Sequence, residues 1–360
     1  GVREVTLIGG EAYLRDDFIL VIRAIREAGM FATLTTGGYN LGQARAEAMV
    51  EAGVSGVSVS IDGLAEHHDV LRQRKDSWAR AVAALGHLRR AGSPITANTQ
   101  INGMTAKDLP QTLERLAAEG IHAWQLQVTV AHGRAGDHPD ILLQPYQYLA
   151  LFEDLAIVAQ RCRELDITLT PANSLGYYGP VVLRGQGGGG AHYGGCQAGI
   201  ATVAIESDGM IKNCPSLGGR NNLGGSWREH GLRALWERAP ELTYMRRRTS
   251  REVWGYCAEC YYADTCRGGC TSVSEPLLGR PGNNPMCHHR ALEMDAMGFR
   301  ERVEFVRTSG GEPFDNGLFR VVREWADPEL RRAWGPVAVD EPRTSRAEHP
   351  EGIGEVVEDL

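Results

Sequence analysis

Seven of the eight cysteines lie close together, between Cys196 and Cys287. Cys196 is followed by twelve residues, a glycine, four residues and Cys214. Cys257-x2-Cys260-x5-Cys266-x3-Cys270 comes next, and Cys287 closes the set. Gaps this short let several thiolates converge on one ion or cluster, and nearby glycines permit the tight backbone that ligation needs. The spacing therefore predicts a compact thiolate site as the organising feature of this part of the chain.

The chain opens on Gly1-Val2-Arg3 and passes directly into a strand-like run, so we expect no signal peptide. That favours a cytoplasmic protein, in which disulfides do not persist and clustered thiols indicate metal or redox chemistry. Two interpretations stay open from spacing alone: iron–sulfur ligation, or zinc bound through Cys-x2-Cys pairs. Seven ligands suit closed tetrahedral zinc sites poorly. We expect Cys162, which lies in a helical pattern, to be a small buried hydrophobe.

Residues 1–172 alternate strand and helix signals, which predicts an α/β fold with a parallel sheet. Strands are expected at Val5–Gly9, Phe31–Thr36, Val54–Ile61, Ile95–Ile101, Trp124–Val130 and Ile167–Thr170. Helices are expected at Asp17–Ala28, Leu41–Ala52, Ser77–Ala91, Asp108–Glu119 and Pro145–Leu165. Polar or glycine-rich loops follow the strands, where enzymes with parallel α/β barrels keep their active sites.

Further along, the pattern becomes irregular. We expect a glycine-rich linker over 173–195, a cysteine-rich domain over 196–290, a C-terminal helical segment over 291–326 and a disordered tail over 327–360. Within this stretch Leu232–Arg238 reads as a short helix and Ala291–Val306 as a longer one. Tyr177, Tyr178 and Tyr193 permit two interpretations, a peptide groove or a packed hinge.

Composition excludes some functional classes. The net charge is 38 − 45 = −7, so there is no basic excess for general nucleic-acid binding. No apolar run of about 18 residues indicates a transmembrane helix, so we expect no membrane partner.

The seven-cysteine pattern resembles the SPASM domain, the auxiliary-cluster extension of radical S-adenosylmethionine (SAM) enzymes. The resemblance implies two auxiliary 4Fe-4S clusters. Cys196, Cys214 and Cys270 would hold the first, whose fourth ligand we do not identify, and Cys257, Cys260, Cys266 and Cys287 would hold the second.

The N-terminal part is similar to the same family. Gly9-Gly10-Glu11 looks like its SAM-binding Gly-Gly-Glu, and Thr35-Thr36-Gly37 looks like the end of its third strand. Ser60-Ile61-Asp62-Gly63, followed by His68-Asp69 and Arg72, resembles its fourth strand and loop, and Gly133-Arg134-Ala135 resembles a turn after its sixth. By this resemblance Gly9, Gly10, Glu11, Thr36, Ser60, Asp62 and Arg134 would bind SAM. For Asp62 a capped turn, and for Arg134 a solvated loop, are equally compatible interpretations.

The family's Cys-x3-Cys-x2-Cys motif, which holds the cluster that cleaves SAM, does not occur in this sequence. The resemblance therefore implies a partial (β/α)6 barrel that lacks its first βα unit, with five of six barrel strands, followed by a small SPASM domain. Truncation of a longer enzyme is our favoured explanation, and the chain as given would then be inactive.

The resemblance implies a peptide-modifying maturase that uses SAM and a third 4Fe-4S cluster in the complete enzyme. Its partners would be a precursor peptide or protein substrate and a small electron donor of the ferredoxin or flavodoxin type. Sulfatase-maturating members carry an acidic residue after the second SPASM cysteine, and Pro215 here disfavours that activity. The alternatives are a non-catalytic iron–sulfur electron-transfer or peptide-binding relative and a zinc-stabilised binding module.

Overall fold

The computed structural model describes residues 1–172, 174–175, 177–181, 195–218, 222–308 and 316–340. The chain divides into two compact units. The first comprises Gly1–Val128, Leu151–Leu175 and Val181–Ala191, and the second comprises Thr129–Ala150, Gly176–Pro180 and His192–Leu360. Among the described residues, no helix is both long enough and apolar enough to cross a lipid bilayer.

The first unit is built on one parallel sheet. Its strands are β1 (Glu4–Leu7), β2 (Phe31–Thr36), β3 (Gly56–Ser60), β4 (Ile95–Ile101), β5 (Ala123–Val128) and β6 (Thr168–Pro171). They lie in sequence order, and each pairs in parallel with the next. Within the described residues β1 and β6 form the two edges, so the sheet is open. The expected α/β class and partial barrel are confirmed, with six strands where the resemblance implied five.

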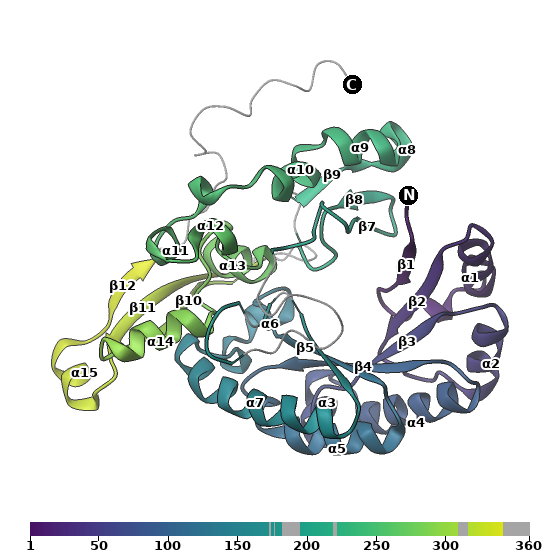
Figure 1. The fold of residues 1–360 in the computed structure, drawn as a ribbon, viewed down its shortest axis with the longest axis horizontal. Coiled ribbons are helices and arrows are strands. Elements are labelled where there is room, and N and C mark those ends of the chain that lie inside the picture. Colours follow the sequence, from purple (N-terminus) through teal and green to yellow (C-terminus); the bar gives the residue numbers. More distant parts are fainter. Residues whose placement is uncertain (173, 176, 182–194, 219–221, 309–315, 341–360) are drawn as a thin grey trace. The chain divides into compact units, whose positions relative to one another are not determined.

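Helices cover one face of this sheet (Figure 1). They are α1 (Phe18–Glu27), α2 (Gln43–Glu51), α4 (Ser77–Arg90), α5 (Leu109–Glu119) and α7 (Tyr148–Glu164), which enters the first unit at Leu151. A short helix that the sequence analysis did not predict, α3 (Ala65–Leu71), precedes α4. Because neighbouring strands are parallel, each crossover returns the chain to the amino end of the sheet, and the loops after the strands all lie at its carboxyl end.

The core of the first unit lies between the strands and these helices. Alternate residues of each central strand are buried, as in β4, where Ala97 and Ile101 are fully covered. The indole nitrogen of Trp124 in β5 donates to the Thr99 hydroxyl over 2.8 Å, and that hydroxyl donates to the Ile61 carbonyl over 2.5 Å. The buried polar groups are thus satisfied inside an otherwise apolar layer.

The second unit contains two antiparallel sheets and several short helices. One sheet joins β7 (Ala204–Ile205), β8 (Met210–Lys212) and β9 (Leu223–Ser226), and the other joins β10 (Phe299–Arg307), β11 (Leu318–Trp325) and β12 (Val337–Asp340). The helices are α6 (Arg134–Asp137), α8 (Trp227–His230), α9 (Leu232–Arg238), α10 (Pro240–Arg247), α11 (Tyr256–Glu259), α12 (Ala263–Cys266), α13 (Thr271–Leu278), α14 (His288–Ala296) and α15 (Pro328–Trp334). The expected helix at Leu232–Arg238 is confirmed with the same bounds.

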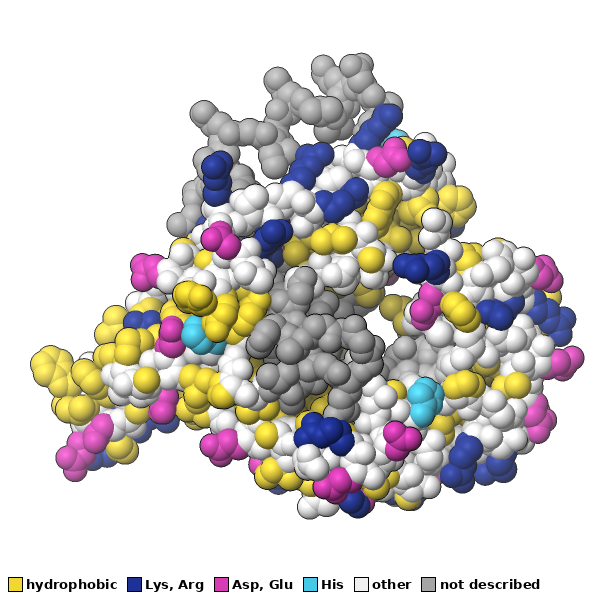
Figure 2. All heavy atoms as spheres, in the orientation of Figure 1, with side chains coloured by type: hydrophobic (Ala, Val, Ile, Leu, Met, Phe, Trp, Pro, Cys, Tyr) yellow, Lys and Arg dark blue, Asp and Glu magenta, His cyan; other side chains and the backbone are white. Residues whose placement is uncertain are grey.

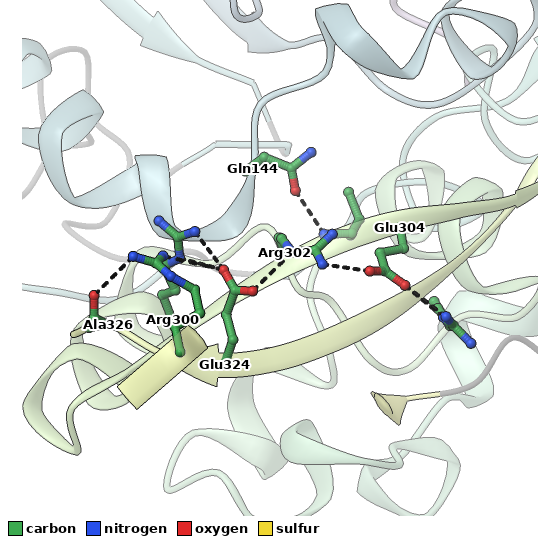
Figure 3. A network of polar contacts seen from close by, with 9 residues as sticks. Gln144, Arg300, Arg302, Glu304, Glu324 and Ala326 are labelled. Carbon is green, nitrogen blue, oxygen red and sulfur yellow. Dashed lines mark hydrogen bonds and ion pairs between the residues drawn. The ribbon is translucent and has the colours of Figure 1, made fainter. Parts of the chain in front are cut away.

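The expectation of a helical segment over 291–326 holds as far as Ala296 and is wrong beyond it. Helix α14 ends before Gly298, whose φ of +78° reverses the chain, and β10 and β11 then form an antiparallel hairpin. Arg300 and Arg302 of β10 both pair with Glu324 of β11, at 2.6 and 3.3 Å (Figure 3). These partly exposed ion pairs contribute little energy each, but they match charges across the hairpin and favour this register.

The expectation of a disordered tail over 327–360 is wrong for residues 327–340. The Asp327 carboxylate accepts from the backbone N–H groups of Glu329 and Leu330, which caps helix α15. Strand β12 then pairs with β11. Hydrophobic side chains gather at this end of the unit (Figure 2), where Trp334 is 74% exposed, and α15 buries none of its residues. Residues 341–360 lie outside the described part of the chain.

Candidate functional site

The turn after β1 contains the first two candidate residues. Gly9 and Gly10 have φ values of +88° and +48°, a region that residues with a Cβ rarely adopt. A Cβ added at either position would meet no atom within 4 Å. The glycines are therefore required by backbone conformation, and the space beside them is open.

Glu11 follows this turn and links the ends of β1 and β2. One of its carboxylate oxygens accepts a hydrogen bond from the Thr36 hydroxyl, and the other accepts from the Gly37 N–H over 3.1 Å. A Cβ on Gly37 would lie 2.7 Å from the Glu11 Oε1 atom, so only glycine permits this approach. Burial, and then the charge of Glu11, raise the pKa of the neighbouring Tyr13 hydroxyl to about 12. The carboxylate keeps lone pairs that could accept from a cationic ligand.

Asp62 lies in the turn after β3 and is buried. Its Oδ2 atom forms an ion pair with Arg72 at 2.6 Å, and its Oδ1 atom accepts from the Gln100 N–H over 3.0 Å. The Asp62 N–H donates to the Nδ1 atom of the buried His68 over 2.9 Å. Because both carboxylate oxygens already bind protein groups, the geometry favours the interpretation of Asp62 as the anchor of this turn.

A row of polar side chains lies on the face of the sheet opposite the helices, and of its members only Ser60 was expected from the sequence. Register places Ser60 of β3 beside Asn98 of β4, Asn98 beside Gln125 of β5, and Gln125 beside Thr170 of β6. These positions alternate with the buried apolar ones. A period-two test for hydroxyl and amide residues, rather than for apolar ones alone, would have found them. Such a row offers donors and acceptors to a ligand that carries hydroxyl groups.

Arg134 begins the short helix α6 and belongs to the second unit, whereas the other candidate SAM-binding residues belong to the first.

Four of the seven clustered cysteines surround one small cavity in the second unit, which is lined by Cys257, Cys260, Cys266 and Cys287 together with aromatic side chains. Burial raises the pKa of each of the four thiols. Charge on Cys287 and Cys257 would raise the pKa of Cys266 further. A group of buried thiols is thus poorly able to ionise unless a bound cation compensates the charge.

The other three clustered cysteines form a second group. Cys196 and Cys214 pack in one hydrophobic cluster with Met245, and charge on Cys270 and Cys214 acts on Cys196. Burial is the main cause that raises the pKa of Cys196 to about 11. Cys270 Sγ lies 3.0 Å from the Ser272 hydroxyl.

All eight cysteines are free thiols. Cys162 is fully buried in α7, apart from both groups, which agrees with its expected structural role. Within the described ranges, no three His, Cys, Asp or Glu side chains are placed to hold a single metal ion. The chemistry of the donors fits iron–sulfur clusters, since thiolates are their usual protein ligands and the glycines beside them permit close backbone approach.

The tyrosines before Cys196 pack against the four-cysteine cavity. The Tyr177 hydroxyl accepts hydrogen bonds from the Cys270 N–H over 3.1 Å and from the Asn284 amide over 2.8 Å. Tyr178 stacks on Tyr262 with ring centroids 4.0 Å apart. These contacts favour the packed interpretation for both residues, and Tyr193 lies outside the described residues.

Comparison with known proteins bears first on the N-terminal part of the chain. Residues 1–116 match the model of the Radical SAM superfamily. The chain is 28% identical over 275 residues to the AdoMet-dependent heme synthase of Methanosarcina barkeri, covering 73% of this chain and 75% of the relative. It is 24% identical over 321 residues to the PqqA peptide cyclase of Ruegeria pomeroyi, covering 82% and 78%.

The fold is similar to that of Streptococcus suis SuiB, solved with its precursor peptide SuiA, with a TM-score of 0.58 at 16% identity. The alignment covers 78% of this chain and 64% of the SuiB chain, so the chain spans less than two thirds of that structure. The chain therefore carries a radical SAM domain, with homologues that include the heme synthase and the PqqA peptide cyclase.

Proposed function

We propose that this chain belongs to a peptide-modifying radical SAM maturase, that it is inactive as given because the Cys-x3-Cys-x2-Cys motif does not occur in it, and that its second unit holds two auxiliary 4Fe-4S clusters. The likeness to PqqA peptide cyclase and to SuiB, which was solved with a precursor peptide, supports a peptide or protein substrate. The partners in this proposal are that substrate and a small ferredoxin- or flavodoxin-type electron donor in the cytoplasm.

The observation that carries the proposal is the separation of seven thiols into a group of four and a group of three. Cys257, Cys260, Cys266 and Cys287 share one cavity. Cys196, Cys214 and Cys270 act electrostatically on one another elsewhere in the same unit. A four-ligand cluster and a cluster with three protein ligands account for this division, whereas paired tetrahedral zinc sites would leave one ligand short.

In the first unit, the chain's own residues would bind and orient SAM. Glu11, held by Thr36 and Gly37, would accept hydrogen bonds from the SAM ammonium group. Gly9 and Gly10 would let the backbone approach the methionine part, because the space beside them is open. In a complete enzyme that also holds the SAM-cleaving cluster, the chemistry supplied there would be a radical able to remove a hydrogen atom from the substrate.

Two further candidates, Ser60 and Asp62, lie in and after β3, where the sugar of SAM would bind. Ser60, with Asn98 and Gln125 in the same row, would hydrogen-bond the ribose hydroxyls. Asp62 would hold the turn after β3 through Arg72 rather than bind the ligand directly.

A second candidate function is modification of a tetrapyrrole. The heme synthase of M. barkeri is more similar to this chain in identity than the peptide cyclase is, at 28% against 24%. The two candidates share the SAM and cluster residues and differ in the substrate.

The first experiment counts iron, sulfide and zinc per chain after anaerobic purification and reconstitution. We expect about eight iron atoms with matching sulfide. Cys260→Ala and Cys196→Ala should each lose about four iron atoms, one cluster's worth. Cys162→Ala, a buried cysteine outside both groups, is the matched control and should lose none. Stoichiometric zinc with negligible sulfide would overturn the proposal and leave a zinc-stabilised binding module.

The substrate class is tested by adding iron-coproporphyrin to the reconstituted protein and following its absorption bands. A saturable shift in those bands would favour the tetrapyrrole. Unchanged bands, together with binding of a precursor-type peptide, would favour the maturase.

A further inference from the structure

Arg248, directly after α10, is buried inside the second unit with only 2% of its surface exposed. Its Nη1 atom donates to the Thr271 hydroxyl over 3.2 Å and lies 3.8 Å from the Met245 sulfur. Its Nε and Nη2 atoms are buried and have no hydrogen-bond partner within the described residues. Guanidinium groups are almost never buried without a counter-charge, because water no longer solvates them.

No carboxylate compensates Arg248 by direct contact in the described part of the chain. Arg248 exerts an electrostatic effect on the carboxyl group of Glu252, and this effect is the weakest of those acting on that group. The Glu252 carboxylate instead accepts from the backbone and hydroxyl of Thr249, over 2.8 and 2.7 Å. The guanidinium lies 5.7 Å from the centroid of the Tyr244 ring, and a contact at this distance compensates its charge only weakly.

The three-cysteine group lies beside this charge. Thr271, which Arg248 contacts, follows Cys270 in the chain, and Met245 packs in one cluster with Cys196. A cation in this position is close enough to stabilise negative charge on a group bound by these cysteines.

The four-cysteine group has a buried arginine too, but that one is compensated. Arg290 forms ion pairs with Glu301 at 2.5 Å and with Asp340 at 2.8 Å, and donates to Asn283 over 2.9 Å. Its charge also acts on Cys257, where it lowers the thiol pKa. Two carboxylates offset Arg290, whereas Arg248 has none, so the two thiol groups experience different electrostatic environments.

We propose that Arg248 is the counter-charge for the group bound by Cys196, Cys214 and Cys270, and that its free N–H groups donate to that group. This inference rests on the proposed function, in which the group is an iron–sulfur cluster. A four-iron core held by thiolates is anionic, and one-electron reduction adds a further negative charge. An adjacent buried cation therefore stabilises the reduced state more than the oxidised one and raises the reduction potential.

The test is a redox titration of the full reconstituted chain with dithionite as the one-electron donor, followed by electron paramagnetic resonance. Arg248→Gln removes the charge and keeps a donor. We expect the midpoint potential of one cluster to become about 59 mV more negative, which is a tenfold lower ratio of reduced to oxidised cluster at the wild-type midpoint. The midpoint potential of the other cluster should stay unchanged. Arg248→Lys keeps the charge and should stay near the wild-type value. Arg247→Gln removes a neighbouring exposed charge and is the matched control.

The outcomes distinguish an electrostatic role of Arg248 from a purely structural one. An unchanged potential in a fully loaded Arg248→Gln protein would overturn the inference. If the glutamine variant folds but loses about four iron atoms, retention of that iron by the lysine variant supports a role for charge. Equal loss in both variants would assign Arg248 a purely structural role and overturn the inference. Absence of iron from the wild-type protein would instead overturn the proposed function. The iron content of the wild-type protein is therefore measured before any variant is made.

Discussion

Acidification should destabilise the first unit through one residue, His68. Its imidazole is buried with 1% of its surface exposed, and its Nδ1 atom accepts a hydrogen bond from the Asp62 N–H. This bond requires the neutral ring, since a protonated Nδ1 would face another donor. The pKa of His68 is lowered from 6.5 to about 4, chiefly by burial. Within that net shift the charges of Asp62 and Asp69 act to raise the pKa and that of Arg72 acts to lower it.

The sign and size of the effect follow from linkage. In the unfolded chain the histidine binds a proton below about pH 6.5, whereas in the folded unit it stays neutral down to about pH 4. The free energy of unfolding is therefore undiminished above pH 6.5 and falls as the pH decreases toward 4. The full loss is about 3 kcal/mol, of which about 2 kcal/mol is lost by about pH 5.

The assay compares urea unfolding of the wild-type protein and His68→Asn at about pH 7.5 and about pH 5. Asparagine places an oxygen acceptor near the Nδ1 position and does not titrate, so its smaller size should cost about 1 kcal/mol at both pH values. The variant should thus show a pH dependence about 2 kcal/mol smaller than that of the wild type. His122→Asn, which replaces an exposed histidine of the same unit, is the control. Equal pH dependence in wild type and His68→Asn, or an NMR titration of His68 with a midpoint near 6.5, would refute the reasoning.

Two further substitutions test the two units separately. Gly37→Ala introduces a Cβ 2.7 Å from the Glu11 carboxylate and should weaken SAM binding about tenfold, as measured by equilibrium dialysis, with little change in melting temperature. Gly42→Ala, where a Cβ meets no atom within 4 Å, is its control, and equal affinities would remove Glu11 from the site. Arg290→Met leaves the buried Asp340 carboxylate without its ion pair and leaves Glu301 paired with Arg323 alone, so it should lower stability by about 3 kcal/mol, as followed by denaturant unfolding. Asp340→Asn should cost less, and a cost no smaller than that of Arg290→Met would contradict the charge argument.

Most elements of the first unit could be predicted because apolar residues recur along the sequence with the spacing typical of a helix or a strand. Helices α1, α2, α4, α5 and α7 all lie within the expected ranges to a few residues. Strand ends were overestimated where apolar residues continue past the last sheet hydrogen bond. Ile8, for example, was counted as strand but lies beyond β1 and is 48% exposed. Local hydrophobicity shows which segments form strands, but pairing with the neighbour sets where they stop.

The C-terminal hairpin was missed because its signal is electrostatic. The run Phe299–Arg307 is rich in charged residues, and periodicity tests weigh apolar ones. Its charges alternate so that Arg300 and Arg302 share one face and meet Glu324 of a distant strand (Figure 3). The pairing with Glu324 depends on the register between two segments more than ten residues apart, and that register cannot be predicted from local sequence.

The candidate site divides in the same way. The cysteines are recognisable by type and spacing, but their separation into two groups depends on the family resemblance until a folded chain is seen. Arg248 is the opposite case, because in the run Arg246-Arg247-Arg248 three identical residues look equally solvated. Only the third is buried, since it follows the last turn of α10 and lies against α13 through Thr271. The sequence around Arg248 predicts a solvent-exposed side chain, yet the side chain is buried with a charge that no carboxylate contacts in the described residues. Burying such a charge lowers stability, so we expect a residue of this kind to be kept for function.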